Sequence, residues 1–356
     1  MADIFDLVDA QVQGDFIAEL QLAEQPLIGA ELWPSRKTMS LDLKFIAGMK
    51  GIPISLKPST LGSRAFQRDR IGAVTVQKEI PFFREQAQVD EVLRRKLVRA
   101  EADATDPYTR EVLAEIFNDT KRLVDGANVV PERMRMGLLF DGRFYIAGPD
   151  KDGKQPIYDY DYDPENEWRT NNVTNLVDTA AWSDHENSDP IGDLQAAIDR
   201  AEDYGVTLTR AICNGTVLKD IMANKNFKNA FRNPDQSLRA FSRAEAINMI
   251  STMLNITLAI YTKKYKDDNE IERSFVPDRA IALFPAGKLG DTVYATTPEE
   301  LDLVSGFSNA SVSVVNTGVT ITTAKEYGPP VNMKTVVSEF VLPSFENMAS
   351  VFVIKY

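Results

Sequence analysis

The chain has 356 residues and a formal net charge of −12, and this acidic balance argues against tight binding of nucleic acid over the whole surface. Its length allows a large core and two domains, and its single cysteine excludes an intramolecular disulfide framework. One cysteine and one histidine cannot build a common zinc site, and no signal peptide or membrane-spanning stretch is recognisable, so we expect a soluble protein made in a cytoplasm.

Residues 1–40 are predicted to form an N-terminal arm. Its apolar residues recur at roughly helical spacing, at Phe5, Val8, Val12 and Phe16. Gly14 weakens this predicted helix. Because a residue before proline is pushed out of the helical region, residues 33–37 around Pro34 are predicted to be extended.

Residues 41–84 form a basic segment of net charge +5, whose strand-forming stretches are interrupted by glycine and proline. It has too few clustered apolar residues for a core of its own. We therefore predict that residues 41–87 form a long hairpin that projects from the body and lies on a partner. The candidate contact residues in this hairpin are Lys44, Lys57, Arg64, Arg68, Arg70 and Lys78.

The chain turns acidic over residues 149–205, which carry a net charge of −11. The opposite charges of this segment and the basic hairpin favour docking between copies of the chain. An ordinary solvated surface would have the same composition, and the sequence does not decide between the two readings.

A long amphipathic helix is predicted after the basic hairpin. Asp106 and Pro107 supply its N-cap and first residue, and Gly126 is predicted to end it. A hairpin is predicted next, with strands at residues 138–140 and 144–146 joined by a tight Asp-Gly turn.

Helices and strands then alternate in a central body. Asp189 and Ser242 are predicted to cap two helices, the second with a capping box. Strands are predicted at residues 206–213 and 256–261. The last 45 residues are rich in strand-forming stretches.

Residues 275–300 are strongly specified, yet they contain no nucleophile, base or metal-ligand set. Residues 280–284 are an apolar run that predicts a strand buried on both faces. A sharply bent loop follows, with Pro285, Gly287 and Gly290. Residues 297–300 form a capping box with proline at the first helical position.

Elsewhere the catalytic inventory is thin. His185 is interpreted as a solvated loop residue and Cys213 as a buried, inert thiol. Residues 148–154 have the spacing of a phosphate loop, but Gln155 stands where a Ser or Thr is needed. Residues 159–165 alternate acidic and aromatic side chains like a calcium loop, but Pro164 stands where the loop needs glycine, so a solvated acidic loop is favoured over weak cation binding.

Three blocks of sequence together resemble the lambda-type major capsid proteins of tailed phages, the protein E family. The first block comprises residues 33–37, 40–44 and 51–55, and the start of a helix at Asp90 and Glu91. The second is residues 275–300, and the third comprises residues 330–332 and 343–346. The blocks extend over nearly the whole chain, and the likeness is greatest to members from phages of Gram-positive hosts.

The resemblance implies an α+β fold of the Hong Kong 97 type. Its parts would be an N-terminal arm (1–40), an extended loop (41–87), a peripheral domain with a long spine helix (88–185), an axial domain (186–306) and returning C-terminal strands (307–356). Gly287, Lys288 and Gly290 would turn near neighbouring subunits. The implied protein is not an enzyme and has no cofactor or metal.

The resemblance also implies self-assembly as pentamers and hexamers into an icosahedral shell around double-stranded DNA, without sequence-specific DNA binding or membrane contact. A separate scaffolding protein, a portal and a decoration protein are the implied partners. The location would be the virion, after assembly in the host cytoplasm. A lysine–asparagine crosslink between subunits occurs in the wider fold class, but no local pattern selects a pair from Lys50, Lys57 and Lys78 of the loop and Asn332 and Asn347 near the C-terminus. The alternative is a soluble cytoplasmic enzyme or a cation-modulated binding protein that uses residues 159–165.

Overall fold

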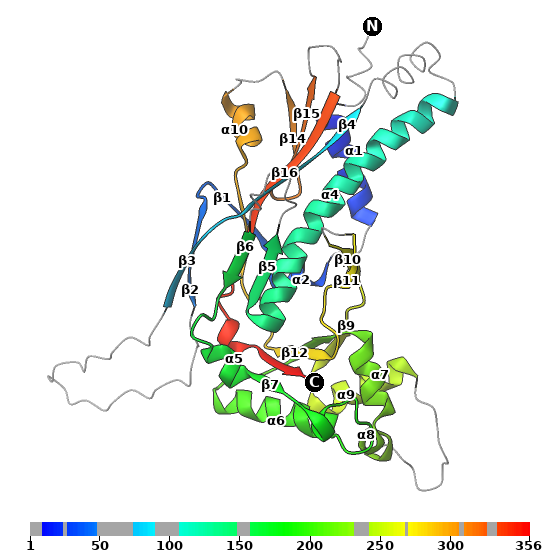
Figure 1. Cartoon of the computed structure of the whole chain (residues 1–356), viewed down its shortest axis with the longest axis vertical. Coiled ribbons are helices and arrows are strands. Elements are labelled where there is room, and N and C mark those ends of the chain that lie inside the picture. The colour runs from blue at the N-terminus through cyan, green and yellow to red at the C-terminus, as the bar shows by residue number, and fades with distance from the viewer. Residues whose placement is uncertain are drawn as a thin grey trace, which may run out of the picture. The chain divides into compact units, whose positions relative to one another are not determined.

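The computed structural model describes residues 9–23, 27–47, 74–89, 107–147, 157–230, 242–267, 270–305, 310–325 and 333–356. The chain divides into two compact units. Unit 1 comprises residues 1–44, 77–133 and 291–344, and unit 2 comprises residues 45–76, 134–290 and 345–356. Each unit has its own sheet (Figure 1).

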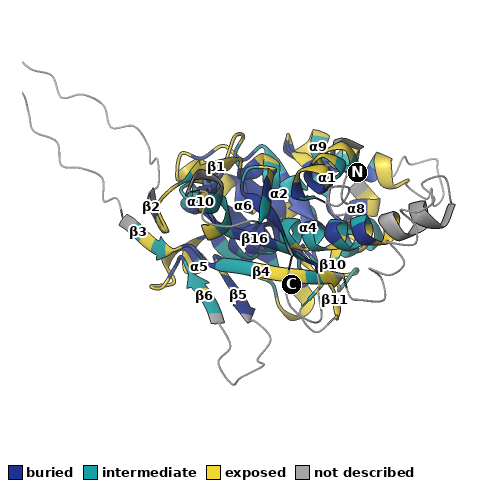
Figure 2. Ribbon diagram, turned by 90° about the horizontal axis from the view of Figure 1, so that it is seen from above, coloured by how far each residue is buried: buried dark blue, intermediate teal, exposed yellow. Residues whose placement is uncertain are grey.

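Unit 1 contains a six-stranded sheet. Its order is β1 (Ser35–Thr38), β13 (Thr292–Ala295), β16 (Met333–Pro343), β15 (Val319–Lys325) and β14 (Ser311–Val315), and β4 (Phe82–Val89) also pairs with β16. The predicted extended residues 33–37 are largely in β1, which pairs in parallel with β13. Residues 82–87, predicted as part of the projecting hairpin, are instead paired with β16 along β4. This strand is only partly buried (Figure 2), which explains why its sequence reads as polar and exposed.

The helix predicted in the N-terminal arm is α1 (Ala10–Ala23), which packs on β14, β15 and the part of α4 (Pro107–Asp141) that belongs to unit 1. Gly14 has a packing role here, because a Cβ atom on it would lie 2.5 Å from the Ser313 hydroxyl oxygen. The Ala10 N–H donates to the Thr323 hydroxyl at 3.2 Å. The glycine therefore permits close contact with the sheet, which outweighs its low helix propensity.

Helix α4 corrects two predictions. It continues through Gly126 and Pro131 to Asp141, so Gly126 does not end it. Residues 138–140, predicted as a strand, form its last turn and are fully buried. Burial of these apolar side chains overrides their strand propensity and stabilises the longer helix. The predicted Asp-Gly turn joins a helix to a strand instead of two strands, because Gly142, with φ +63°, links α4 to β5 (Arg143–Ala147). The partner of β5 is β6 (Ile157–Asp161).

Unit 2 contains a five-stranded sheet in the order β7 (Val173–Asn175), β17 (Phe352–Lys355), β12 (Ala280–Phe284), β8 (Arg210–Cys213) and β9 (Thr257–Ile260). All five residues of β12 are buried, which confirms the predicted buried strand. A hydrophobic cluster joins this sheet to the helices α6 (Pro190–Asp203), α7 (Gly215–Ala223), α8 (Lys225–Ala230) and α9 (Arg243–Leu254).

The helix starts in unit 2 confirm the predicted caps. The Asp189 carboxylate accepts from the Gly192 N–H, and Ser242 forms a reciprocal capping box with Glu245. The remaining elements are α2 (Ile28–Leu32), β2 (Asp42–Ala47), β3 (Val74–Glu79), α5 (Glu167–Asn172), β10 (Lys264–Lys266), β11 (Glu272–Ser274), α10 (Pro298–Ser305) and short 3₁₀ turns at Asp178–Ala180 and Met348–Ser350.

Candidate functional site

The base of the predicted basic hairpin is a two-stranded sheet of β2 and β3. Lys44 on β2 is exposed and Lys78 on β3 is half-buried. The candidate residues Lys57, Arg64, Arg68 and Arg70 lie outside the described residues. The contact role of all six basic candidates therefore stays a prediction.

The loop after β12 is fastened to the chain's own C-terminal segment within unit 2. The Asn347 side-chain N–H donates to the Lys288 carbonyl oxygen at 2.9 Å, and the Asn347 backbone N–H donates to the Leu289 carbonyl oxygen at 3.0 Å. Leu289 is fully buried, and Gly287 has φ +95°, a backbone conformation that favours glycine. The predicted sharp bend is confirmed. Whether Gly287, Lys288 and Gly290 contact a neighbouring subunit stays a prediction.

Helix α10 in unit 1 is anchored by its first-turn carboxylates. Glu300 pairs with Lys37 of β1, while Glu299 pairs with Arg84 of β4 and accepts from the Ser338 hydroxyl of β16. The predicted cap at its start is confirmed in part, because the Thr297 hydroxyl accepts from the Glu300 N–H. Arg84, from the predicted hairpin, thus forms an ion pair within its own subunit.

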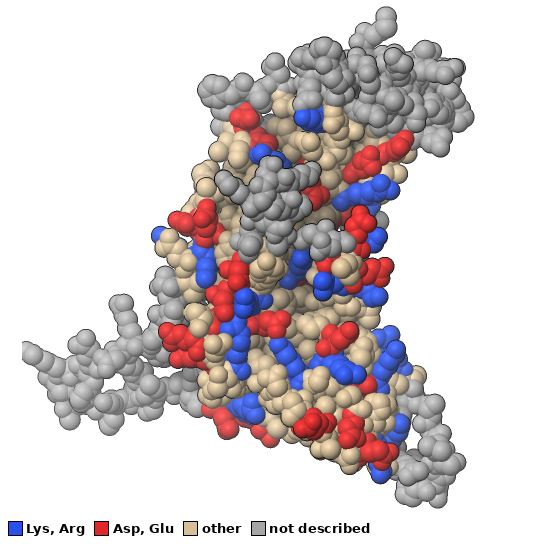
Figure 3. Space-filling model, viewed as in Figure 1, with Lys and Arg blue, Asp and Glu red and all other residues tan. Residues whose placement is uncertain are grey.

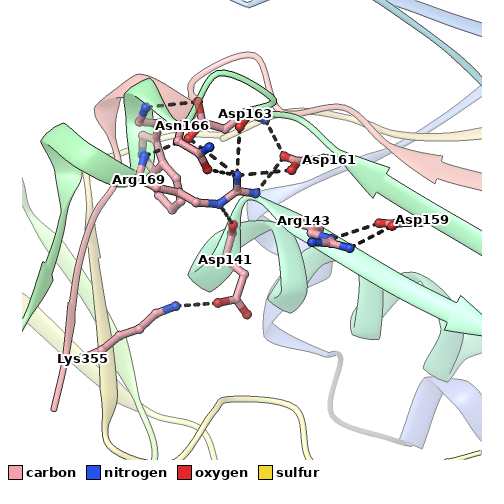
Figure 4. A network of polar contacts seen from close by, with 9 residues as sticks. Asp141, Arg143, Asp159, Asp161, Asp163, Asn166, Arg169 and Lys355 are labelled. Atoms are coloured by element: carbon pink, nitrogen blue, oxygen red, sulfur yellow. Dashed lines mark hydrogen bonds and ion pairs between the residues drawn. The ribbon is translucent and has the colours of Figure 1, made fainter.

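The acidic segment around β6 is held by one arginine of α5 (Figure 4). The Arg169 guanidinium makes two hydrogen bonds to the Asp161 carboxylate, at 2.7 and 3.2 Å, and donates to the carbonyl oxygens of Asp163 and Asp141 at 2.8 and 2.9 Å. The Asp163 carboxylate accepts from the backbone N–H groups of Trp168 and Arg169. Burial disfavours the charge of Asp161, but the hydrogen bonds that its carboxylate accepts from Arg169 and from the Asp163 N–H outweigh burial and lower the pKa of Asp161.

Two further ion pairs lie beside this network. Arg143 binds Asp159 through two hydrogen bonds, at 3.0 and 2.8 Å, and Lys355 binds the Asp141 carboxylate. Asp141, Arg143 and Lys355 line a hollow of about 740 Å³ in unit 2, together with Asp161 and Arg169. The basic side chains of this hollow, Arg143, Arg169 and Lys355, are each paired with a carboxylate of the chain. Their charges are therefore already neutralised within the subunit.

Among the described residues no group of three His, Cys, Asp or Glu side chains could hold a metal ion, and no helix is long and apolar enough to cross a membrane. Burial raises the pKa of Cys213 to about 12, consistent with the predicted inert thiol. His185 is less free than predicted, because its ring lies 3.1 Å from the Asp220 carboxylate. Over the described residues on the face in Figure 3, acidic and basic side chains are interspersed.

The sequence matches a known protein family. A family model for phage major capsid protein E matches residues 17–311, which is most of the chain. The chain belongs to this family. The predicted resemblance to the protein E family is thereby confirmed, and this capsid protein forms the shell of a phage head.

Solved structures agree with that assignment. The capsid protein aligns with a protein assigned as the capsid protein of a prophage of E. coli CFT073, with a TM-score of 0.57 and 16% identity over 96% of this chain and 98% of that chain. It also aligns with a phage-related protein from Bordetella bronchiseptica RB50, with a TM-score of 0.54 and 14% identity over 96% of each chain. Identities this low show the fold alone, and they confirm the α+β fold of the Hong Kong 97 type. No curated protein matches the sequence.

The family match does not support the alternative of an enzyme or a cation-modulated binding protein. All three carboxylates of Asp159, Asp161 and Asp163 are ion-paired with arginine side chains, and Asp163 also accepts from backbone N–H groups. Sequence reasoning missed the role of Arg169. The available signal was that Arg169 is one of the few basic residues in a strongly acidic segment.

Proposed function

We propose that this capsid protein assembles as pentamers and hexamers that close into an icosahedral shell around double-stranded phage DNA. The match to the capsid protein E family carries this proposal. A closed lattice needs many copies of modest contacts rather than a reactive group, and the paired charges of the described surface fit that requirement.

The finer parts of the proposal follow the sequence. The proposed divisions of the subunit are the arm (1–40), the extended loop (41–87), the peripheral domain (88–185), the axial domain (186–306) and the returning strands (307–356), with residues 82–87 of the loop paired to β16. The proposed contacts to an adjacent subunit are made by six basic residues of the loop: Lys44, Lys57, Arg64, Arg68, Arg70 and Lys78. A scaffolding protein, a portal and a decoration protein are the proposed partners, the host cytoplasm is the proposed place of assembly, and a Gram-positive host stays a prediction.

The net charge of −12 is proposed to keep the shell from holding its DNA tightly, because DNA must leave the particle. We expect isolated subunits to bind double-stranded DNA weakly. A strong affinity that falls steeply with salt concentration would contradict this part of the proposal.

Sedimentation velocity and negative-stain electron microscopy of the purified full chain test the central proposal. We expect discrete capsomers or shells, at least when a scaffolding protein is co-expressed. A chain that stays monomeric both alone and after co-expression with a scaffolding protein would refute the proposal. On a denaturing gel, subunits of mature particles are expected to run as monomers, because no pattern selects a lysine–asparagine crosslink; Asn332 lies outside the described residues, and the Asn347 amide already binds the Lys288 carbonyl oxygen.

A further inference from the structure

The turn between β1 and β2 is fixed from both sides within unit 1 (Figure 1). On one side, the Thr296 N–H donates to the Thr38 carbonyl oxygen at 3.1 Å. On the other side, the Ile80 N–H donates to the Leu41 carbonyl oxygen at 2.8 Å. Both donors belong to distant parts of the sequence, so residues 38–42 are held in place by the fold.

Hydrogen bonds inside the turn fix it further. The Ser40 N–H donates to the Thr38 hydroxyl at 3.2 Å, and the Asp42 N–H donates to the Ser40 hydroxyl at 3.1 Å. The same turn exposes two apolar side chains: Met39 is 93% exposed and Leu41 is 48% exposed. Met39 is the most exposed large hydrophobic side chain among the described residues.

We propose that this turn is an assembly contact that seats Met39 and Leu41 against a second copy of the chain; the inference rests on the proposed shell-forming function. An ordered turn that displays apolar side chains loses little entropy when a partner covers it, which makes it a pre-organised contact. Methionine is also enriched at protein interfaces, where its flexible side chain adapts to a partner.

The size of the patch favours a contact that is repeated in a lattice. Two side chains of this size cover on the order of 200 Å², whereas a stable one-to-one complex buries roughly 800 Å² on each partner. The turn alone cannot hold a separate soluble partner. In a closed shell the same contact is repeated in every subunit and acts together with others, so a small contact is sufficient.

The position of the turn supports the same occupant. Residues 38–42 lead directly into the loop at residues 41–87, which is proposed to lie on an adjacent subunit. Ile80, which holds the turn, follows β3 at the other end of that loop. The turn therefore lies at the base of the proposed inter-subunit contact and would extend it.

Methionine oxidation of the unmodified chain tests the inference. Free subunits and assembled particles are separated by sedimentation, treated with hydrogen peroxide, and analysed by peptide mass spectrometry. Met39 is expected to oxidise quickly in the free subunit and at least fivefold more slowly in particles. The buried Met134 is the slow reference in both samples, and unfolded chain gives the full rate.

Each outcome has one meaning. Particles in which the Met39 rate falls less than fivefold overturn the inference while the shell-forming function stands. Slow oxidation of Met39 already in the free subunit overturns it as well, because the side chain is then covered by its own chain. If phosphatidylglycerol vesicles slow the oxidation of Met39 in free subunits while assembly into particles does not, the turn contacts a lipid surface and the inference is overturned. If no particles form in any preparation, the proposed function itself fails.

A pair of variants gives a second measurement. Met39→Glu is expected to lower the particle yield at least fivefold, because it places a charge in an apolar contact. Met39→Leu is expected to retain the yield, because it conserves apolar volume. Circular dichroism of the free subunits checks that both variants fold, and unimpaired assembly of folded Met39→Glu would overturn the inference.

Discussion

Replacing Arg169 by alanine is expected to loosen the connection between β6 and α5. The guanidinium makes five hydrogen bonds, to oxygen atoms of Asp141, Asp161, Asp163 and Asn166. The Arg169 side chain is 25% exposed and that of Asp161 is 32% exposed, so their ion pair is intermediate between buried and surface pairs. Breaking a buried pair costs about 3–5 kcal/mol, while exposed pairs contribute about 0–1 kcal/mol. We therefore expect a loss of about 2–3 kcal/mol.

Native-state hydrogen exchange measures this loss locally. The amides to follow are those of Trp168 and Arg169, which donate to the Asp163 carboxylate at 3.2 and 2.9 Å. Since about 1.4 kcal/mol corresponds to a factor of ten, their exchange should accelerate by roughly 30- to 150-fold in Arg169→Ala.

A matched control is Arg122→Ala in α4. Arg122 is 81% exposed and pairs with Asp119 at i,i+3, a geometry worth about 0.2–0.5 kcal/mol. Its effect on local exchange should be less than about threefold. If Arg169→Ala also changed exchange at Trp168 and Arg169 by less than threefold, the reasoning that this arginine organises the acidic segment would be refuted.

Three further predictions concern other residues. Burial raises the pKa of Asp161, but its hydrogen bonds to Arg169 and to the Asp163 N–H lower it overall, so the stability from its charge is present above the unfolded pKa and is lost as pH falls through the folded pKa. The protection of the β6 amides relative to their intrinsic exchange rate at each pH should therefore fall below about pH 4, and Asp161→Asn should flatten that dependence. Gly14→Val should destabilise unit 1 by about 2 kcal/mol in urea denaturation, because its side chain would clash with Ser313, whereas Gly126→Ala should stabilise it by about 0.5–1 kcal/mol, because nothing lies within 4 Å of a Cβ there; equal effects would contradict this. Cys213, whose pKa burial raises to about 12, should resist a maleimide at pH 7 until the chain unfolds, and rapid labelling of the folded chain would contradict its burial.

Local signals in the sequence were sufficient for some elements. The caps at Asp189 and Ser242 depend on residues within three positions, and the structure has both. The buried strand β12 was recognisable because its apolar run is short and ends at a proline. The predicted helix end at Gly126 was wrong, because a helix can continue through an exposed glycine when packing elsewhere along the helix compensates for its low helix propensity.

The ionic network needed information that the sequence does not contain. Asp161 and Asp163 were recognised as a spaced acidic pattern, but their partner Arg169 is brought to them by the turn into α5, and Asp141 reaches Arg169 only because α4 continues beyond its predicted end. Because the predicted helix ends at Gly126, the sequence does not place Asp141 beside Arg169. An acidic segment with an isolated arginine should therefore be examined for internal ion pairing before a metal site is proposed.

The chemically inert segment at residues 275–300 illustrates why a capsid protein is recognised by shape. It supplies the central strand of the unit 2 sheet, β12, and then an inner strand of the unit 1 sheet, β13. The connection between them is held at each end by a different hydrogen bond: Asn347 donates to the Leu289 carbonyl oxygen in unit 2, and Ser344 donates to the Asp291 carbonyl oxygen in unit 1. A reactive side chain would add nothing to that task, whereas a changed backbone angle at Gly287 would alter the path of the chain. Conserving the path instead of a reaction is what a shell-forming function requires.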